Sequence, residues 1–125
     1  VEGKSVSNPE TIATAIRIGN PVNKEKALLV RESSNGKFLS VTDLEIINAY
    51  KILGKEEGIF CEPASAASVA GLLKIKKDVP KNSTIVCVLT GNGLKDPDCA
   101  IKNNDSIFHT GVEAEINSIT KKMGL

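Results

Sequence analysis

The strongest constraint on the fold is a short apolar run that ends in a glycine turn. Residues 84–89 read TIVCVL and carry no charge, which is typical of a strand buried on both faces of a parallel sheet. The turn that follows is Thr90-Gly91-Asn92-Gly93. In open α/β sheets ligands bind beyond the carboxyl ends of strands, and glycine lets the backbone approach them closely. The turn is therefore either a ligand-binding loop with Thr90 at its mouth or a tight corner before a helix.

A second strand is predicted upstream, at residues 59–61. It ends at Glu62, and Ser65 is placed to cap an apolar helix that leads toward residues 84–89. Strand, helix and strand form a βαβ unit, whose crossover is right-handed and whose two strands are parallel. Both strands then end at the same edge of the sheet. We therefore expect Glu62 and Ser65 to lie beside Thr90, where the helix N-terminus favours an anionic or electron-rich ligand.

Helical spacing accounts for much of the N-terminal part of the chain. It predicts a short helix over residues 9–19 and a second helix from Asn23, for which a hairpin about Asn35-Gly36 is the alternative. Residues 38–41 are a short strand candidate.

A third helix is predicted where Thr42 and Glu45 have the spacing of a capping box, and Gly54 is its expected end. Its buried stripe comprises Ile46, Ile47, Tyr50 and Leu53. Beyond the glycine turn we expect a short helix over residues 99–102, a loop, and a C-terminal amphipathic helix packed on the domain. The apolar face of that last helix comprises Val112, Ile116, Ile119 and Met123.

Composition disfavours several classes of partner. The chain has 125 residues, enough for one domain with a real core, and its net charge of +1 and aromatic content of 3% disfavour nucleic-acid binding. No run is apolar and long enough to cross a bilayer, so no membrane partner is expected. The cysteines, Cys61, Cys87 and Cys99, lack metal-binding spacing and are interpreted as reduced core residues of a cytosolic protein.

Few residues suit acid–base or metal chemistry. The glycine turn lacks the third glycine of a dinucleotide fingerprint and the lysine of a phosphate loop. His109 is the single histidine, so the sequence supports no histidine metal cluster or catalytic triad, and a surface loop position is expected. Glu62 and Asp96 are either a pair of catalytic carboxylates or turn and cap residues that precede prolines.

Three stretches of the chain resemble successive signatures of threonine synthases. They are PETIATAIRIGNP at residues 9–21, EGIFCEPASAAS at 57–68 and LTGNGLKDP at 89–97. Their order and spacing match the family, and the resemblance covers nearly the whole chain. Serine and threonine dehydratases of the same fold are similar, but usually continue the glutamate-proline turn with serine-glycine-alanine. The run Ala64-Ser65-Ala66-Ala67 therefore favours the synthase.

This resemblance implies a fold-type II pyridoxal-phosphate enzyme related to the tryptophan synthase β chain. The fold would be α/β, with a three-layer, open, mostly parallel sheet and flanking helices. The reaction would convert O-phosphohomoserine and water to threonine and phosphate in threonine biosynthesis. The whole enzyme is expected to be a homodimeric lyase of the cytoplasm, or of the plastid in a plant-type host.

The same resemblance assigns the site residues. The Thr90 hydroxyl would bind the pyridine nitrogen of pyridoxal 5'-phosphate, where a neutral donor suits an unprotonated nitrogen. Gly91 and Gly93 would let the loop close under the ring. Glu62 and Ser65 would line its neighbourhood as supports.

The catalytic residues of the family have no counterpart in this chain. The Schiff-base lysine, the asparagine beside the ring, the glycine-rich phosphate loop and the substrate-phosphate ligands belong to parts that precede this segment, and Lys95 matches a different family position. Residues 1–125 are thus expected to be the C-terminal part of the catalytic domain. The alternatives are a dehydratase-like enzyme of the same fold and a non-catalytic module for small-ligand binding or protein association.

We predict that the isolated chain neither binds pyridoxal phosphate covalently nor makes threonine, because no lysine matches the Schiff-base position. We also expect it to self-associate through an unpaired sheet edge. Absorption spectroscopy with borohydride trapping tests the first expectation, and sedimentation at high concentration tests the second. A stoichiometric adduct at one lysine, or a strictly monomeric chain, would contradict them.

Overall fold

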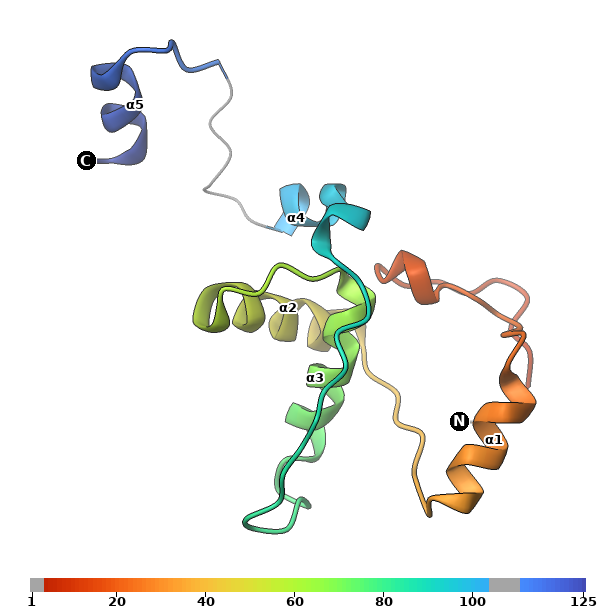
Figure 1. The fold of residues 1–125 in the computed structure, drawn as a ribbon. Helices are drawn as coiled ribbons and strands as arrows, with labels where there is room; N and C mark the ends of the chain where they lie inside the picture. Colours follow the sequence, from red (N-terminus) through yellow and green to blue (C-terminus); the bar gives the residue numbers. More distant parts are fainter. Residues whose placement is uncertain (1–3, 104–110) are drawn as a thin grey trace.

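The computed structural model describes residues 4–103 and 111–125, and its regular structure there is helical (Figure 1). The elements are η1 (Thr14–Ile16), α1 (Lys24–Ser33), α2 (Asp43–Glu57), α3 (Pro63–Ile75), η2 (Gly93–Lys95), α4 (Pro97–Asn103) and α5 (Ile116–Met123). Within this part of the chain no strand forms. A single antiparallel bridge joins Cys61 to Asn92.

Helix α2 begins at the predicted capping box. The backbone N–H of Glu45 donates to the Thr42 hydroxyl (3.2 Å), and the N–H of Thr42 donates to the Glu45 carboxylate (2.7 Å). This backbone hydrogen bond, assisted by Lys74, lowers the pKa of the Glu45 carboxyl. The expected end at Gly54 is wrong, because α2 continues to Glu57 and ends at Gly58, whose φ of 66° is the left-handed conformation that closes a helix.

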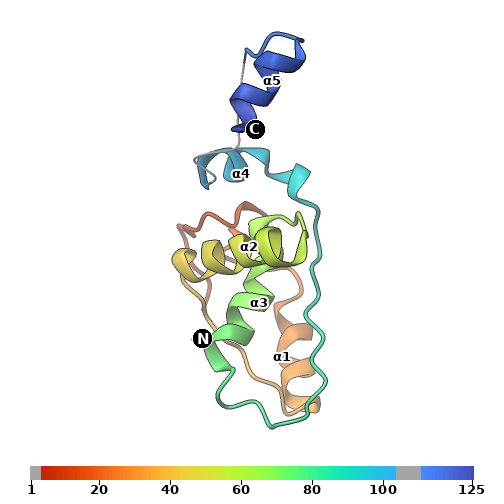
Figure 2. The ribbon, with the colours of Figure 1, turned by 90° about the vertical axis from the view of Figure 1, so that its left-hand side faces the viewer.

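The core lies where α2 packs against α3. Helix α2 contributes Ile46, Ala49, Tyr50 and Leu53, so three members of the predicted stripe are buried and Ile47 is half-buried. Helix α3 contributes Ala66 and Ala70, whose small side chains let the two helices approach closely. Figures 1 and 2 show α2 crossing the N-terminal half of α3.

The predicted helix over residues 9–19 is wrong, because only Thr14–Ile16 form a 3-10 turn. The Thr11 hydroxyl donates to the Asp43 carboxylate at 2.6 Å, and the N–H of Ile12 donates to the same carboxylate at 3.1 Å. Side-chain hydrogen bonds of this kind offer the backbone an alternative to helix formation. They anchor the segment to the start of α2 instead.

Helix α1 is confirmed, and the alternative hairpin is wrong. The N–H of Gly36 donates to the carbonyl of Arg31 (2.8 Å), and Asn35 has a φ of 51°, so the pair that could have made a hairpin turn ends a helix. The Arg31 guanidinium lies over the Phe38 ring at 5.6 Å. No residue of α1 is buried, and Figure 1 shows the helix standing apart from α2 and α3.

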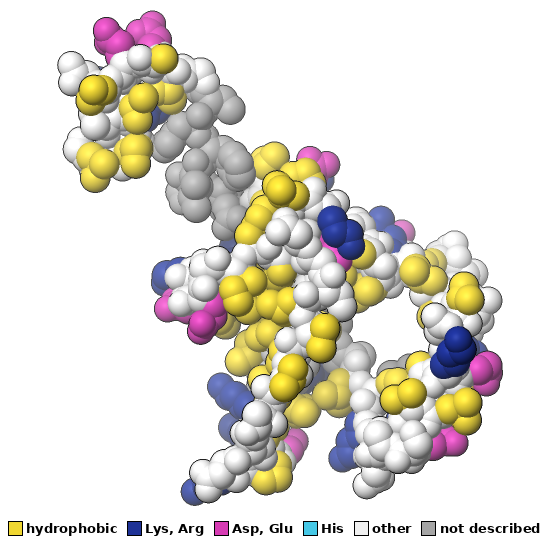
Figure 3. All heavy atoms as spheres, viewed as in Figure 1, with side chains coloured by type: hydrophobic (Ala, Val, Ile, Leu, Met, Phe, Trp, Pro, Cys, Tyr) yellow, Lys and Arg dark blue, Asp and Glu magenta, His cyan; other side chains and the backbone are white. Residues whose placement is uncertain are grey.

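The predicted sheet is absent from the described residues. Residues 38–41 and 84–90 are extended but belong to no ladder, and residues 59–61 contribute only the isolated bridge. Val86 is 82% exposed and Val88 is 65% exposed, so the expectation of burial on both faces is wrong here. A strand needs a neighbouring strand to satisfy its backbone, and the described chain places none alongside. Figure 3 shows hydrophobic side chains at the surface along this segment.

The C-terminal helices are present, but the second does not pack as expected. Helix α4 starts at Pro97, where Asp96 accepts a hydrogen bond from the Cys99 N–H (3.3 Å). The predicted loop with His109 falls at residues outside the described ranges. Helix α5 has no buried residue and lies apart from α2 and α3 in both views (Figures 1 and 2). No helix of the described ranges is long and apolar enough to span a bilayer.

Replacing Thr42 by alanine should lower the free energy of unfolding by about 1 kcal/mol, because the first turn of α2 loses its side-chain cap. Urea unfolding followed by circular dichroism measures the change. Ser40→Ala is the matched control, since the Ser40 hydroxyl is exposed and makes no hydrogen bond within the described chain. Equal stability of the two variants would contradict the role assigned to the capping box.

Candidate functional site

The predicted site residues meet where two segments of the chain cross beside the start of α3. The N–H of Glu62 donates to the carbonyl of Gly91 (3.0 Å), and the N–H of Gly93 donates to the carbonyl of Phe60 (3.1 Å). The proximity of Glu62 and Thr90 is therefore as expected. Its geometry is not, because the segments run antiparallel at their bridge instead of ending side by side as parallel strands.

Ser65 joins α3 to the glycine turn and is not the helix cap. Glu62 occupies the cap position and Pro63 the first helical position, where a residue without an N–H and with a fixed φ fits well. Ser65 thus lies inside the first turn of α3, with 2% of its surface exposed. Its hydroxyl accepts from the N–H of Gly91 (2.8 Å) and lies 3.2 Å from the hydroxyl of Thr90.

Glu62 is a buried carboxylate held by one cation. The residue is 4% exposed, and the Lys95 ammonium group donates to its Oε1 at 3.0 Å. Lys95 reaches in from η2 while most of its own side chain stays in solvent. Sequence reasoning missed this pair. The signal was that Glu62 is the single charge between Glu57 and Lys74, in a stretch apolar enough to require a partner.

Both glycines of the turn are closely packed, Gly91 against the buried Glu62 and Gly93 against Phe60, which is 44% exposed. A Cβ atom on Gly91 would overlap the Glu62 carboxyl group, and one on Gly93 would overlap the Phe60 ring. Neither glycine has a positive φ, so the requirement comes from close packing and not from backbone conformation. The turn is therefore seated against the chain that precedes α3, while Thr90 at its start is exposed.

Glu62 and Asp96 do not form a pair of catalytic carboxylates. Glu62 is paired with Lys95, whereas Asp96 accepts from the Thr14 hydroxyl (2.9 Å) as well as from the first turn of α4. The interpretation of Asp96 as a cap residue is therefore confirmed. Its second oxygen also attaches η1 to this end of the molecule.

Cys61 and Cys99 are buried free thiols, as expected of core residues, and Cys87 is half-buried. Burial raises the pKa of the Cys61 thiol, and the neighbouring charge of Glu62 raises it further. The pKa of Cys99 is also raised, mainly by burial. Both are thus poor nucleophiles at neutral pH. Among the residues described, no cluster of histidine, cysteine, aspartate or glutamate could hold a metal ion.

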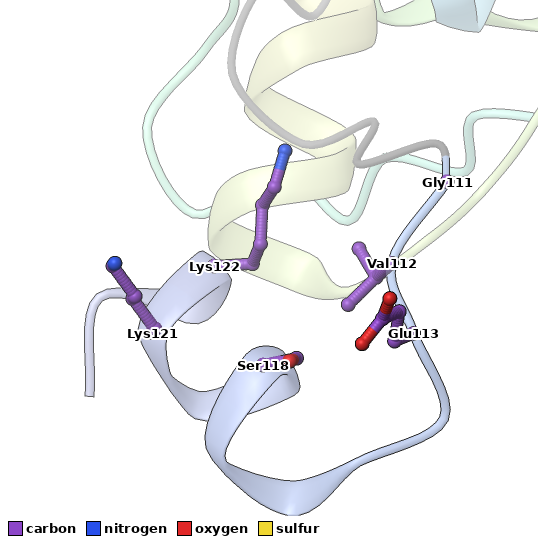
Figure 4. A pocket seen from close by; sticks show the side chains of 6 residues that line it. All are labelled: Gly111, Val112, Glu113, Ser118, Lys121 and Lys122. Carbon is purple, nitrogen blue, oxygen red and sulfur yellow. The ribbon is translucent and has the colours of Figure 1, made fainter.

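Two cavities of the described chain lie away from this site. One of about 480 Å³ lies along α5 and the segment before it. Figure 4 shows Lys121, Lys122 and Ser118 around it, with Glu113 and Val112 opposite. A second, of about 520 Å³, lies along α1 and includes Arg31 and Phe38. Neither includes a predicted site residue.

The same substitution should have opposite effects at two glycines. Gly91→Ala should lower the free energy of unfolding by about 1–3 kcal/mol, because the added methyl group displaces Glu62. Gly54→Ala should raise it by about 0.5–1 kcal/mol, because Gly54 lies inside α2 with open space around its Cβ position. Chemical unfolding of both variants provides the measurement. A Gly91→Ala variant as stable as Gly54→Ala would contradict the packing argument.

Comparison with known proteins identifies the family. A family model described as "Pyridoxal-phosphate dependent enzyme" matches residues 2–91. The chain is 58% identical over 124 residues to threonine synthase of Synechocystis. The aligned region covers 99% of the chain and 32% of that relative. It is 50% identical over 127 residues to threonine synthase of Mycobacterium tuberculosis, covering 100% of the chain and 35% of the relative.

An archaeal relative agrees with these two. Threonine synthase of Methanocaldococcus jannaschii is 51% identical over 116 residues, covering 91% of this chain and 28% of its own length. The chain thus spans about a third of the length of the curated relatives it matches. Since the family model covers most of the residues, including the Glu62 turn, Ser65 and Thr90, the chain belongs to the family of pyridoxal-phosphate dependent enzymes.

Proposed function

We propose that the chain is the C-terminal part of the catalytic domain of a threonine synthase. The whole enzyme would convert O-phosphohomoserine and water to threonine and phosphate. The observation that carries the proposal is a turn with an exposed Thr90 hydroxyl, seated on a buried carboxylate and a buried serine, in a chain 50–58% identical to threonine synthases. All five predicted site residues belong to this one cluster.

The donor set of the turn fits the pyridine ring of pyridoxal phosphate. Thr90 offers a neutral hydroxyl, which can donate to an unprotonated ring nitrogen, whereas a carboxylate would hold that nitrogen protonated. The Glu62 carboxylate cannot bind the ring nitrogen in this way, because it is buried behind Gly91 and paired with Lys95. When bound, the cofactor supplies an electron sink for the reaction at the amino acid. This chain would hold one edge of the ring and keep a carboxylate away from the ring nitrogen.

The remaining site residues would act through Thr90. Gly91 and Gly93 would let the turn lie close against the chain beneath it, because a Cβ atom at either position would overlap Glu62 or Phe60. Ser65 and Glu62 would hold the turn in place. The Ser65 hydroxyl accepts from the Gly91 N–H, and the Glu62 N–H donates to the Gly91 carbonyl. Because neither side chain is exposed, we assign both to support of the cofactor and not to contact with substrate.

The exposed apolar segments are consistent with a larger sheet. Residues 84–90 would be a strand of the three-layer, mostly parallel sheet of the whole enzyme, paired with strands contributed by the rest of the protein. Exposed Val86 and Val88 and the lack of ladder partners in the described chain support this assignment. The whole enzyme would be a homodimer. It would be located in the cytoplasm, in keeping with the free cysteines of this chain.

Replacing Thr90 by valine in the full-length enzyme should weaken pyridoxal-phosphate binding about tenfold or more, because one hydrogen bond to the ring is lost. Threonine formation from O-phosphohomoserine should fall with it, and Thr90→Ser should restore both. Absorption titration and phosphate release measure the two effects. Thr84→Val is the matched control, since Thr84 lies at the other end of the same segment from Thr90 and the glycine turn.

Two results would contradict the proposal. Thr90→Val could bind the cofactor as well as the unmodified enzyme, which would remove Thr90 from the site. Alternatively, the full-length enzyme could deaminate threonine or serine and leave O-phosphohomoserine unchanged. That result would favour the dehydratase alternative.

A further inference from the structure

We propose that Ser65 is a positioning residue that makes Thr90 a hydrogen-bond donor toward the cofactor. The inference rests on the proposed function, because it concerns the hydroxyl assigned there to the ring nitrogen. The two hydroxyl oxygens lie 3.2 Å apart, close enough for one to donate to the other. Ser65 is 2% exposed, so water does not compete for its hydroxyl.

The Ser65 hydroxyl can donate only one hydrogen bond. A serine hydroxyl has one proton and two lone pairs. One lone pair accepts the Gly91 N–H at 2.8 Å. The proton then has two possible acceptors, the Thr90 hydroxyl at 3.2 Å and the Gly91 carbonyl at 3.3 Å. The carbonyl already accepts the N–H of Glu62 at 3.0 Å, whereas the Thr90 oxygen has no other donor among the described contacts.

The direction of the Ser65 proton decides what Thr90 offers to a ligand. When Ser65 donates to Thr90, the Thr90 proton is free to point out of the turn, and Thr90 is a donor. When Ser65 donates to the Gly91 carbonyl, Thr90 donates back to Ser65 and presents only lone pairs. The first arrangement matches an unprotonated ring nitrogen, and the second matches a protonated one. Donation from Ser65 also polarises the Thr90 hydroxyl and strengthens it as a donor.

The chain contains a close control for this effect. Ser68 lies one turn further along α3, and its hydroxyl is within hydrogen-bond distance of the carbonyls of Ser65 (3.0 Å) and Val88 (3.3 Å). It therefore also links α3 to the extended segment, but it does not touch Thr90. Removing the Ser68 hydroxyl tests for a general loss of packing. Removing the Ser65 hydroxyl tests in addition for a change in the Thr90 proton.

The experiment uses the full-length enzyme loaded with pyridoxal phosphate labelled with ¹⁵N in the ring, and reads the ¹⁵N chemical shift and the cofactor dissociation constant. Ser65→Ala should move the resonance in the same direction as Thr90→Val and weaken binding about threefold to tenfold. Ser65→Thr should restore both, and Ser68→Ala should leave the resonance unchanged. Ser65→Cys, whose thiol is a weaker donor, should give a smaller displacement and serves if the alanine variant does not fold.

The outcomes separate this inference from the function on which it rests. The double variant Ser65→Ala with Thr90→Val should match Thr90→Val alone, because Ser65 acts through Thr90. A resonance that moves with Thr90→Val but not with Ser65→Ala overturns the inference and leaves the proposed function intact. Additive displacements overturn it too, since Ser65 would then act through Gly91. A resonance unchanged by Thr90→Val contradicts the proposed role of Thr90 itself.

Discussion

The seating of the glycine turn on the first residues of α3 is the contact on which the site depends. Besides the Ser65 hydroxyl proton, which lies within reach of the Thr90 hydroxyl and the Gly91 carbonyl, four hydrogen bonds join the two segments: Glu62 to Gly91, Gly93 to Phe60, Gly91 to Ser65, and Lys95 to Glu62. Each would be weak in water, but three of them involve Glu62 or Ser65, which are buried, so losing one would leave a polar group without a partner. The result is a hydrogen-bonded turn whose hydroxyl-bearing residue, Thr90, is exposed. A ligand that binds there meets a surface already organised before it arrives.

Around this contact, many apolar side chains of the described residues are exposed. The core where α2 packs on α3 consists largely of alanines and a few larger side chains, whereas Val86, Val88, Val22 and Ile116 are mostly exposed. Exposed apolar side chains on an extended backbone without partners are what a sheet strand displays before its neighbours are added. The chain matches about a third of the length of these relatives. In the described residues the glycine turn is thus hydrogen-bonded to the start of α3, while several apolar segments are exposed.

Local patterns predicted helix starts well where a side chain caps the first turn. The capping box of α2 and the start of the helix after Asp96 follow from side chains within four residues of each helix start. Predictions failed where a distant group competed. Residues 9–19 have good helical spacing, but Asp43 takes the hydrogen bonds of Thr11 and Ile12. The described residues form no sheet, since an extended segment becomes a strand only when another strand lies beside it.

The sequence by itself predicted which residues come together in the candidate site, because the Glu62 turn, Ser65 and the glycine turn are short signatures readable without coordinates. It also predicted that Gly91 and Gly93 allow a close approach of the turn to another group. Tertiary structure decided how these residues act on one another. Only the crossing of the two segments turned Ser65 from an expected helix cap into the partner of Thr90, paired Glu62 with Lys95, and placed the Gly91 Cβ position against a carboxylate. The physical reason is that a hydroxyl or carboxylate has several possible hydrogen-bond partners in a local sequence pattern. Once the group is buried it must form a hydrogen bond, and the fold decides which partner lies close enough.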